Sequence, residues 1–353
     1  MVQGTARRLL HPRGPVDAGE DNAAESQRGN LAHYLITGAA GFIGAQTACM
    51  LAAEGHTVVG VDNLNDAYDV RMKEHRLERL RRTPGVEFRR IDISGKNDVE
   101  NLAGEGFAAI IHLAARAGVR ASVENPGLFY ETNVMGTLHL LELSRQAGIG
   151  KFVLASTSSI YGANAPYPTP ESASSSEPLQ PYAASKKAGE VLAHAYHFLH
   201  GLDVSILRFF TVYGPAGRPD LAMFRFCQWI HEDETVRVNG TGEQSRGFTY
   251  LDDIARGTIL ALKPVGFEII NLGGHEVITI NELIQLLERT IGRKARIEYG
   301  APNTADMLSN WADVSKAGKL LGWQPQVSLK EGVRRLVDWY VAERSWARSI
   351  LTQ

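Results

Sequence analysis

HYLITGAAGFIG, residues 33–44, joins a short apolar run to three evenly spaced glycines, Gly38, Gly41 and Gly44, and continues into a helical pattern. Glycines in such a turn let the backbone and the helix N-terminus come close to a diphosphate. The spacing G-x-x-G-x-x-G is one residue wider than the standard dinucleotide fingerprint, so a plain glycine turn between packed elements is the alternative. We expect a dinucleotide site formed by the glycines with Phe42 and Ile43.

A carboxylate follows the second apolar run, at the position where a dinucleotide-binding unit uses one to bind ribose. The second apolar run, residues 57–61, is followed by Asp62, roughly 20 residues after the glycine turn, as the fingerprint requires. This carboxylate can bind the adenosine ribose hydroxyls, and its charge would repel the 2′-phosphate of NADP. We therefore expect NAD as the cofactor. Other residues are expected either to border the cofactor or to have a structural role: Asn63, Asp92, Ile93, Leu113, Ala114, Ala115, Asn133 and Phe209.

Six short apolar runs alternate with stretches of helical spacing, at residues 33–37, 57–61, 86–91, 109–113, 151–155 and 204–208. This alternation is typical of a parallel sheet with crossover helices. We expect an α/β fold, with a doubly wound parallel sheet of Rossmann type that binds NAD within residues 31–214. After residue 215 the elements shorten, which predicts a smaller C-terminal, substrate-binding α/β region over residues 215–353, interleaved with the first. Residues 1–30 are polar and predict a flexible N-terminal extension.

The composition excludes several classes of function. The 353 residues are 44% hydrophobic and 22% charged, with a formal net charge of −2 and a pI of about 6.6, so no basic field points to nucleic acid or to an anionic membrane. No apolar stretch has signal-peptide or transmembrane length. Cys49 and Cys227 lie far apart without metal-ligand spacing, so we expect buried thiols, a cytoplasmic location and no metal site.

A tyrosine and a lysine stand four residues apart in Tyr-Ala-Ala-Ser-Lys, at Tyr182 and Lys186. On a helix this spacing puts both side chains on one face. A free phenol, with a pKa of about 10, is a poor base at neutral pH, and a neighbouring ammonium lowers that pKa. The pair could therefore move a proton while a dinucleotide moves a hydride.

Hydroxyl groups crowd the end of the fifth apolar run, where Thr157, Ser158 and Ser159 occur in succession. Because ligands bind at the carboxyl ends of the strands in a doubly wound sheet, Thr157 can hydrogen-bond a substrate hydroxyl and share a proton with Tyr182. A serine-rich turn without a ligand is the alternative, and for this segment alone it is the better choice.

Two arginines are candidates for binding an anionic part of the substrate. Arg218 follows the sixth apolar run and Thr211, within Gly-Arg-Pro-Asp, and Arg246 precedes a helix that opens at residues 252–253. A guanidinium can bind a carboxylate or a phosphate with two hydrogen bonds. Taken singly, each arginine is more often part of a surface salt bridge.

Together these motifs make residues 31 to about 345 resemble the nucleotide-sugar epimerase group of the extended short-chain dehydrogenases/reductases. The motifs are the glycine turn, His112-Leu113-Ala114-Ala115, Asn133, the Tyr182/Lys186 pair and Leu320-Leu321-Gly322-Trp323-Gln324-Pro325. The resemblance implies tightly held NAD, a UDP-sugar substrate, and a homodimer built from helices at about residues 126–147 and 180–200. Arg116 stands where relatives commonly have a neutral residue.

The hydroxyl segment narrows the resemblance within the group. Dehydratases of this superfamily carry an Asp-Glu pair where Ser158 and Ser159 stand here, so the resemblance excludes dehydration. The hydroxyls, Thr211 and the Arg218 loop are similar to those of UDP-glucuronate 4-epimerases, in which they would meet the C6 carboxylate. Arg246 would bind phosphate.

This resemblance implies epimerisation at C4, in which Tyr182, helped by Thr157, takes the C4 hydroxyl proton while a hydride passes to NAD⁺ and later returns to the other face of the sugar. The 4-keto uronate would be a β-keto acid, which loses CO₂ readily when its carboxylate stands perpendicular to the ketone. Fixed hydrogen bonds can hold the carboxylate away from that alignment. The alternatives are a UDP-glucose 4-epimerase, a UDP-glucuronate decarboxylase and a dinucleotide sensor that has lost catalysis.

Overall fold

The computed structural model describes residues 31–301 and 309–352. The described residues from Ala32 onward form one compact unit. The predicted flexible extension, residues 1–30, lies outside the described residues, and the division of the remainder at residue 215 stays a prediction.

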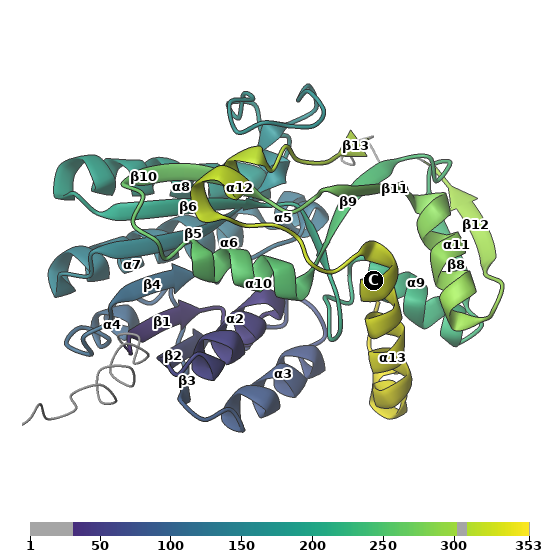
Figure 1. Ribbon diagram of the computed structural model, residues 1–353, viewed down its shortest axis with the longest axis horizontal. Coiled ribbons are helices and arrows are strands. Elements are labelled where there is room, and N and C mark those ends of the chain that lie inside the picture. Colours follow the sequence, from purple (N-terminus) through teal and green to yellow (C-terminus); the bar gives the residue numbers. More distant parts are fainter. Residues whose placement is uncertain (1–30, 302–308, 353) are drawn as a thin grey trace, which may run out of the picture. The chain divides into compact units, whose positions relative to one another are not determined.

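A parallel seven-stranded sheet organises this unit (Figure 1). The strands in spatial order are β10 (Phe267–Leu272), β6 (Asp203–Phe209), β5 (Lys151–Thr157), β4 (Ala109–His112), β1 (His33–Thr37), β2 (Thr57–Asp62) and β3 (Val86–Arg90). Every neighbouring pair is parallel. The six predicted strands are confirmed to within two residues at each end. The order 3-2-1-4-5-6 reverses between β1 and β4, which is where a doubly wound sheet binds its ligand.

The seventh strand, β10, is not among the strands that the sequence predicts. Its sequence, Phe-Glu-Ile-Ile-Asn-Leu, interrupts the apolar pattern with two polar residues. Asn271 is nevertheless fully buried, because it accepts a hydrogen bond from the Tyr161 hydroxyl at 2.6 Å and donates one to the carbonyl of Thr169 at 2.9 Å. Partners distant in sequence therefore hold this strand, and the region after residue 215 completes the main sheet.

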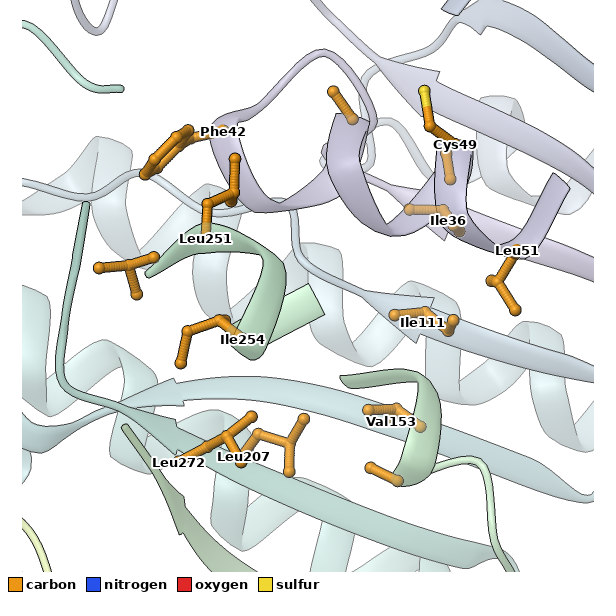
Figure 2. Packing of buried hydrophobic residues seen from close by; sticks show 14 of the residues in the cluster. Ile36, Phe42, Cys49, Leu51, Ile111, Val153, Leu207, Leu251, Ile254 and Leu272 are labelled. Atoms are coloured by element: carbon orange, nitrogen blue, oxygen red, sulfur yellow. The ribbon is translucent and has the colours of Figure 1, made fainter. Parts of the chain in front are cut away.

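Helices cover both faces of this sheet. The face in Figure 2 is covered by α2 (Phe42–Ala53) and α10 (Leu251–Leu260), and Ile36, Ile111, Val153 and Leu207 of four strands pack against them. Since neighbouring residues of a strand point to opposite faces, Leu35, Ile110 and Phe152 lie on the other side, in a cluster with Leu140 and Leu141 of α7 (Gly136–Ala147) and Ala193 of α8 (Pro181–His200). Burial of each such Leu or Ile contributes on the order of 1.5–3 kcal/mol.

The smaller region is centred on β9 (Ser245–Tyr250). It pairs in parallel with β7 (Thr211–Tyr213) and β13 (Ser309–Asn310) and antiparallel with β11 (Glu276–Thr279). β8 (Thr235–Asn239) and β12 (Arg296–Gly300) form a separate parallel pair. α9 (Ala222–His231), α11 (Ile280–Ile291) and α13 (Leu329–Ala347) bury a second core with this sheet. Figure 1 shows these elements beside the carboxyl ends of the main strands.

Apart from α3, the remaining elements are short. They are α3 (Arg71–Arg81), α4 (Lys96–Glu100), α5 (Val119–Glu124), α6 (Pro126–Tyr130), the π-helical turn η1 (Glu131–Met135), the 3₁₀ turn η2 (Ser158–Tyr161) and α12 (Ser315–Leu321). None of the helices in the described part of the chain is long and apolar enough to cross a bilayer.

Candidate active site

The glycine turn lies between the end of β2 and the loop after β4. The N–H of Ala39 donates to the carbonyl of Val61 at 3.1 Å. Gly38 has a φ of +71°, and a Cβ there would lie 2.7 Å from the backbone nitrogen of Ala114. A side chain at Gly38 would therefore strain the turn and push away the loop that carries Leu113, Ala114 and Ala115.

The N-terminus of α2 fits an anion. Its N-cap is Gly41, which has no side chain to accept from the first-turn amides, and the first turn contains no acidic residue. The amides of Phe42, Ile43 and Gly44 and the helix dipole therefore suit the diphosphate of a dinucleotide. These residues fit the cofactor that the sequence predicts.

Asp62 lies at the end of β2, where it is buried beside a cation that the sequence reasoning missed. Its Oδ1 accepts from the N–H of Leu64 at 2.8 Å and from the ammonium of Lys73, on α3, at 3.2 Å. Both bonds end on Oδ1, so the second oxygen is the one that can accept from ribose hydroxyls. Because Lys73 offsets the charge of Asp62, repulsion of a 2′-phosphate is weaker than the sequence argument assumes.

Asn63 and Asp92 form a hydrogen-bonded border beyond Asp62. The Asn63 amide donates to Asp92 at 2.7 Å, and the amide and hydroxyl of Ser94 donate to the other carboxylate oxygen at 2.9 and 2.7 Å. Burial alone would raise the pKa of Asp92, but these bonds and the charge of Arg116 outweigh it and lower the pKa. Ile93 is buried against Gly136 of α7, so its side chain is part of the core.

Asn133 joins the loop after β4 to the helix that carries the tyrosine. Its side chain accepts from the N–H of Arg116 at 2.8 Å and donates to the carbonyl of the same residue at 3.0 Å. It also donates to the hydroxyl of Ser185 at 2.9 Å, which donates in turn to the carbonyl of Tyr182 at 2.7 Å. Asn133 lies in the π-helical turn η1, and π-turns are frequent at functional sites.

Tyr182 and Thr157 are in contact. Burial raises the pKa of the Tyr182 phenol, while hydrogen bonding with Thr157 and the charge of Arg218 lower it without cancelling the effect of burial. Thr157 accepts from the N–H of Ser159 at 3.2 Å, so its own proton can be donated to the phenol oxygen. The spacing of Tyr182 and Lys186 in the sequence predicts a pKa of Tyr182 below its usual value. The protein groups alone do not produce that result.

Lys186 lies one turn further along α8, deep in the protein. Burial lowers its pKa to about 8, against the opposing effect of Glu190. Burial and the charge of Lys186 together hold the pKa of His112 on β4 well below its usual value. The imidazole is therefore neutral, and it bridges the hydroxyls of Thr37 at 2.7 Å and Thr137 at 3.0 Å.

A buried ion pair anchors α8 to the sheet. Arg208 of β6 donates from Nε and Nη2 to the two oxygens of Glu190 at 2.9 and 2.8 Å, and Ser156 donates to the same carboxylate at 2.6 Å. The guanidinium also lies 4.8 Å from the centre of the Tyr161 ring. Neither charge of this pair is indicated by the sequence reasoning, because a helix and a strand distant in the chain supply them.

The hydroxyls after Thr157 turn toward the smaller region. Ser158 is buried and accepts from the amide of Asn310, in β13, at 3.0 Å. Its own proton is therefore available to an anionic ligand. Ser159 follows at the start of the same 3₁₀ turn and is only partly buried. Phe209, opposite Thr157 in the sheet register, is also partly buried.

Arg218 lies close enough to Tyr182 to lower the pKa of its phenol. It is bound to Asp220, with Nε to Oδ1 at 3.0 Å and Nη2 to Oδ2 at 2.6 Å. Nη2 also donates to the carbonyl of Ala117 at 3.4 Å. The structure thus brings Thr157, Tyr182 and Arg218 into one site. In this structure the carboxylate of Asp220 is bound to the Arg218 guanidinium.

Thr211 and Arg246 belong to the four-stranded sheet. Thr211 begins β7 and pairs with Phe248 of β9, while Arg246 pairs with Asn310 of β13. Arg246 donates from Nη1 to the carbonyl of Ser245 at 2.7 Å. Asn310 in turn reaches Ser158, so β9 and β13 place Arg246 on the same side as the hydroxyl turn.

No group of three or more His, Cys, Asp or Glu residues within residues 31–301 and 309–352 is arranged to hold a metal ion. The histidines on α8 have other partners: His194 and His197 pack on the ring of Phe267, and His200 on Tyr196.

The parallel sheet, the glycine turn and the Tyr182/Lys186 pair define a protein of the extended short-chain dehydrogenase/reductase class. A sequence profile of the NAD dependent epimerase/dehydratase family matches residues 34–273, and the chain belongs to this family.

Similar proteins cover almost the whole chain. The UDP-glucuronate 4-epimerase of Thermodesulfobacterium geofontis (strain OPF15) is 52% identical over 311 residues, which span 88% of this chain and 96% of that protein. A mutant UDP-glucuronic acid 4-epimerase from Bacillus cereus, solved with UDP-4-deoxy-4-fluoro-glucuronic acid and NAD, has a TM-score of 0.84 at 35% identity and covers 88% of this chain and 99% of its own. The UDP-glucose 4-epimerase of Thermotoga maritima, solved with UDP-glucose, has a TM-score of 0.83 at 32% identity, with the same coverage.

Proposed function

We propose that the protein is an NAD-dependent UDP-glucuronate 4-epimerase, which interconverts UDP-glucuronate and UDP-galacturonate. The observation that carries this proposal is an arginine, Arg218, close enough to the Tyr182 phenol to lower its pKa. An enzyme for a neutral sugar has no need of a cation at that place, whereas a uronate brings a carboxylate to it. The T. geofontis relative carries the same name.

The residues that would hold NAD are the first-turn amides of α2, Asp62 and the loop after β4. Asn63, Asp92 and Asn133 would border or support them, together with Phe209 at the end of β6. When bound, NAD supplies the hydride acceptor and a positively charged ring.

Proton transfer is the part of the reaction that the chain performs. Tyr182 takes the proton of the C4 hydroxyl, and Thr157 donates to the phenolate oxygen that accepts it. Lys186 adds a positive charge one turn along α8, and its lowered pKa of about 8 leaves it mainly protonated at neutral pH. The same phenol returns the proton when the ketone is reduced on its other face, so no net oxidation results.

The C6 carboxylate of the substrate would explain why several hydrogen-bond donors lie around Tyr182. Ser158, whose oxygen already accepts from Asn310, would donate its proton to the carboxylate. Ser159, Thr211 and Arg218 supply further donors. Several fixed hydrogen bonds keep the carboxylate of the 4-keto intermediate out of the orientation that releases CO₂. Arg246, at the edge of this site, would bind the UDP phosphates.

We also propose a homodimer that buries one face of α8 with the neighbouring helices. Phe198 and Leu199 at the end of α8 are 79% and 68% exposed, and Val191 is exposed on the same helix. Tyr130 of α6 and Met135 of η1 are exposed on elements that contact α8. An apolar surface of this kind is typical of an interface. The cytoplasmic location, which is based on the two unpaired cysteines, stays a prediction.

Product analysis tests the proposal. The purified protein, with bound NAD confirmed by absorbance and mass spectrometry, should convert UDP-glucuronate into UDP-galacturonate. The absence of that product would refute the assignment. The second candidate is a UDP-glucose 4-epimerase, favoured by the likeness to the T. maritima structure, and formation of UDP-galactose as the faster reaction would support it. A UDP-pentose product would instead indicate decarboxylation.

A further inference from the structure

Arg116, after β4, is a mostly buried guanidinium whose donors the protein does not fully use. Its side chain is 17% exposed, and its Nε is buried without a hydrogen-bond partner among the described residues. The ion pair that it forms is long, with Nη1 4.0 Å from Oδ1 of Asp66, and the Asp66 side chain is 96% exposed. A buried charge is costly unless it is paired and hydrogen-bonded. The charge of Arg116 also acts on Asp92, but no hydrogen bond joins these two side chains in the described residues, so the guanidinium is placed for a further acceptor.

The backbone of Arg116 is fixed, so the position of its side chain is not a property of a loose loop. Asn133 binds both the N–H and the carbonyl of Arg116, at 2.8 and 3.0 Å, and is itself fully buried. Two hydrogen bonds from one side chain hold the residue at a set distance from η1 and α8. The fold thus directs this guanidinium to one place.

The Arg116 side chain extends from the loop after β4 toward the loop after β2, on the other side of β1. In the sheet, β1 lies between β4 and β2. Arg116 comes from the loop after β4, and Asp66 comes from the loop after β2. The loop after β4 also touches the turn, since a Cβ on Gly38 would meet the backbone of Ala114. A contact between Arg116 and Asp66 therefore bridges the two loops on either side of the end of β1, the strand that leads into the glycine turn.

We propose that Arg116 binds the diphosphate of NAD from the side opposite the glycine turn, and that Asp66 holds the guanidinium over it. This inference rests on the proposed function in one respect, that the cofactor is NAD. The diphosphate would accept from first-turn amides of α2 on one side and from the guanidinium, including Nε, on the other. Charge-assisted bonds of this type are about twice as strong as neutral ones. The bridge would slow release of the cofactor. Slow release suits an epimerase, because each turnover regenerates NAD⁺ in place and no cofactor has to be exchanged.

The test is the rate at which NAD leaves the loaded protein, with no sugar nucleotide present. Released NAD is followed by enzymatic cycling after gel filtration. Arg116→Gln should release NAD about tenfold to a hundredfold faster than the wild type, the range expected for loss of hydrogen bonds to a charged group. Arg116→Lys keeps the charge but loses the planar donors, so its rate should lie between the two. Asp66→Asn should accelerate release less than Arg116→Gln.

Arg82→Gln is the matched control, because Arg82, at the C-terminal end of α3, is 82% exposed and pairs at 3.6 Å with Glu78, which is also exposed. It should release NAD at the wild-type rate. The midpoint of thermal unfolding of the NAD-free protein should be the same in Arg116→Gln and the wild type, and the two midpoints should separate when NAD is added.

Equal release rates in Arg116→Gln and the wild type would overturn the inference. So would an equal loss of unfolding midpoint with and without NAD, since that result would indicate a purely structural role. The failure of the proposed function is a separate outcome, because it appears as a missing product from UDP-glucuronate while the release rates still differ.

Discussion

Two arginine–carboxylate pairs belong to the surroundings of α8, the helix that carries Tyr182, or of its phenol, and they differ in burial. Arg208 and Glu190, between β6 and α8, are each 2% exposed. Arg218 and Asp220, in the loop after β7, are 22% and 33% exposed. Breaking a buried pair leaves an uncompensated charge and costs about 3–5 kcal/mol, whereas a pair near the surface contributes about 0–1 kcal/mol. Arg208 is therefore fixed to its partner, while Arg218 can exchange Asp220 for a substrate carboxylate at little cost.

The comparison separates two tasks that arginines perform around one site. Arg208 holds the catalytic helix in place on the main sheet, a region that is buried on both sides. Arg218 belongs to the smaller region, where polar side chains meet the substrate. The first arginine should matter for stability and the second for the choice of substrate.

The largest expected effect concerns the phenol of Tyr182, on which Arg218 acts and Arg208 does not. Tyr182→Phe should lower the epimerisation rate by about 10³-fold or more, because it removes the proton acceptor. The ring keeps its contact with Phe129, so the unfolding midpoint should change little. Turnover measured by NMR that stays near the wild-type rate would contradict the mechanism.

Loss of the buried Arg208–Glu190 pair should lower the free energy of unfolding. Arg208→Met should lower the free energy of unfolding by about 3–5 kcal/mol, because Glu190 would be left buried with only the partly exposed Lys187, at 3.2 Å, as its cation. The double variant Glu190→Met with Arg208→Met should recover most of that loss, since apolar residues then fill both positions. Urea denaturation measures both values. A single variant as stable as the wild type would show that the pair does not anchor α8.

The same pair should also make stability depend on pH. Burial alone would raise the pKa of Glu190, but the hydrogen bonds and charge of Arg208 outweigh it and lower the pKa. A carboxyl whose pKa is lowered on folding contributes stability above its unfolded pKa, and this is lost as the pH falls through the folded value. Acid unfolding of Glu190→Gln should therefore be less steep than that of the wild type. Superimposable acid transitions would contradict this sign.

Arg218 should set the pH dependence of the rate. Its charge lowers the pKa of Tyr182 against the effect of burial. In Arg218→Gln the pKa of the phenol should rise, and the rate should increase with pH only at more alkaline values than in the wild type. Profiles of kcat/KM for both proteins check the shift. A shift toward acid would show that Arg218 does not act on the phenol.

The smallest expected effect is the cost of Arg218 to the fold. Arg218→Gln should lower the free energy of unfolding by about 1 kcal/mol or less, because the pair with Asp220 is partly exposed. Urea denaturation beside Arg208→Met gives the comparison directly. Equal losses in the two variants would remove the distinction between the two arginines.

Local patterns in the sequence were sufficient for the main sheet and the catalytic pair. Six strands follow from apolar runs bounded by glycines and polar residues, and Tyr182 and Lys186 share a helix face through their spacing alone. The family follows from the order of these motifs. In each case the deciding residues are close together in the chain.

The features that the sequence did not predict depend on contacts between distant segments. β10 carries Asn271 in its interior, which is buried only because Tyr161 and the backbone of Thr169 pair with it. Lys73 of α3 forms an ion pair with Asp62 at the end of β2. Glu190 of α8 forms one with Arg208 of β6. The pKa of Tyr182 was misjudged for the same reason, since burial by surrounding segments outweighs a neighbouring charge.

The central claim is that Arg218 selects a carboxylated sugar. Its most direct test is the ratio of kcat/KM for UDP-glucuronate to that for UDP-glucose, measured side by side by NMR in the wild type and in Arg218→Gln. We predict that the wild type prefers the uronate, and that Arg218→Gln lowers kcat/KM for the uronate by about tenfold to a hundredfold more than kcat/KM for the neutral sugar, which falls only through the raised pKa of Tyr182. An unchanged rate on the uronate, or an equal fall on both sugars, would contradict the claim.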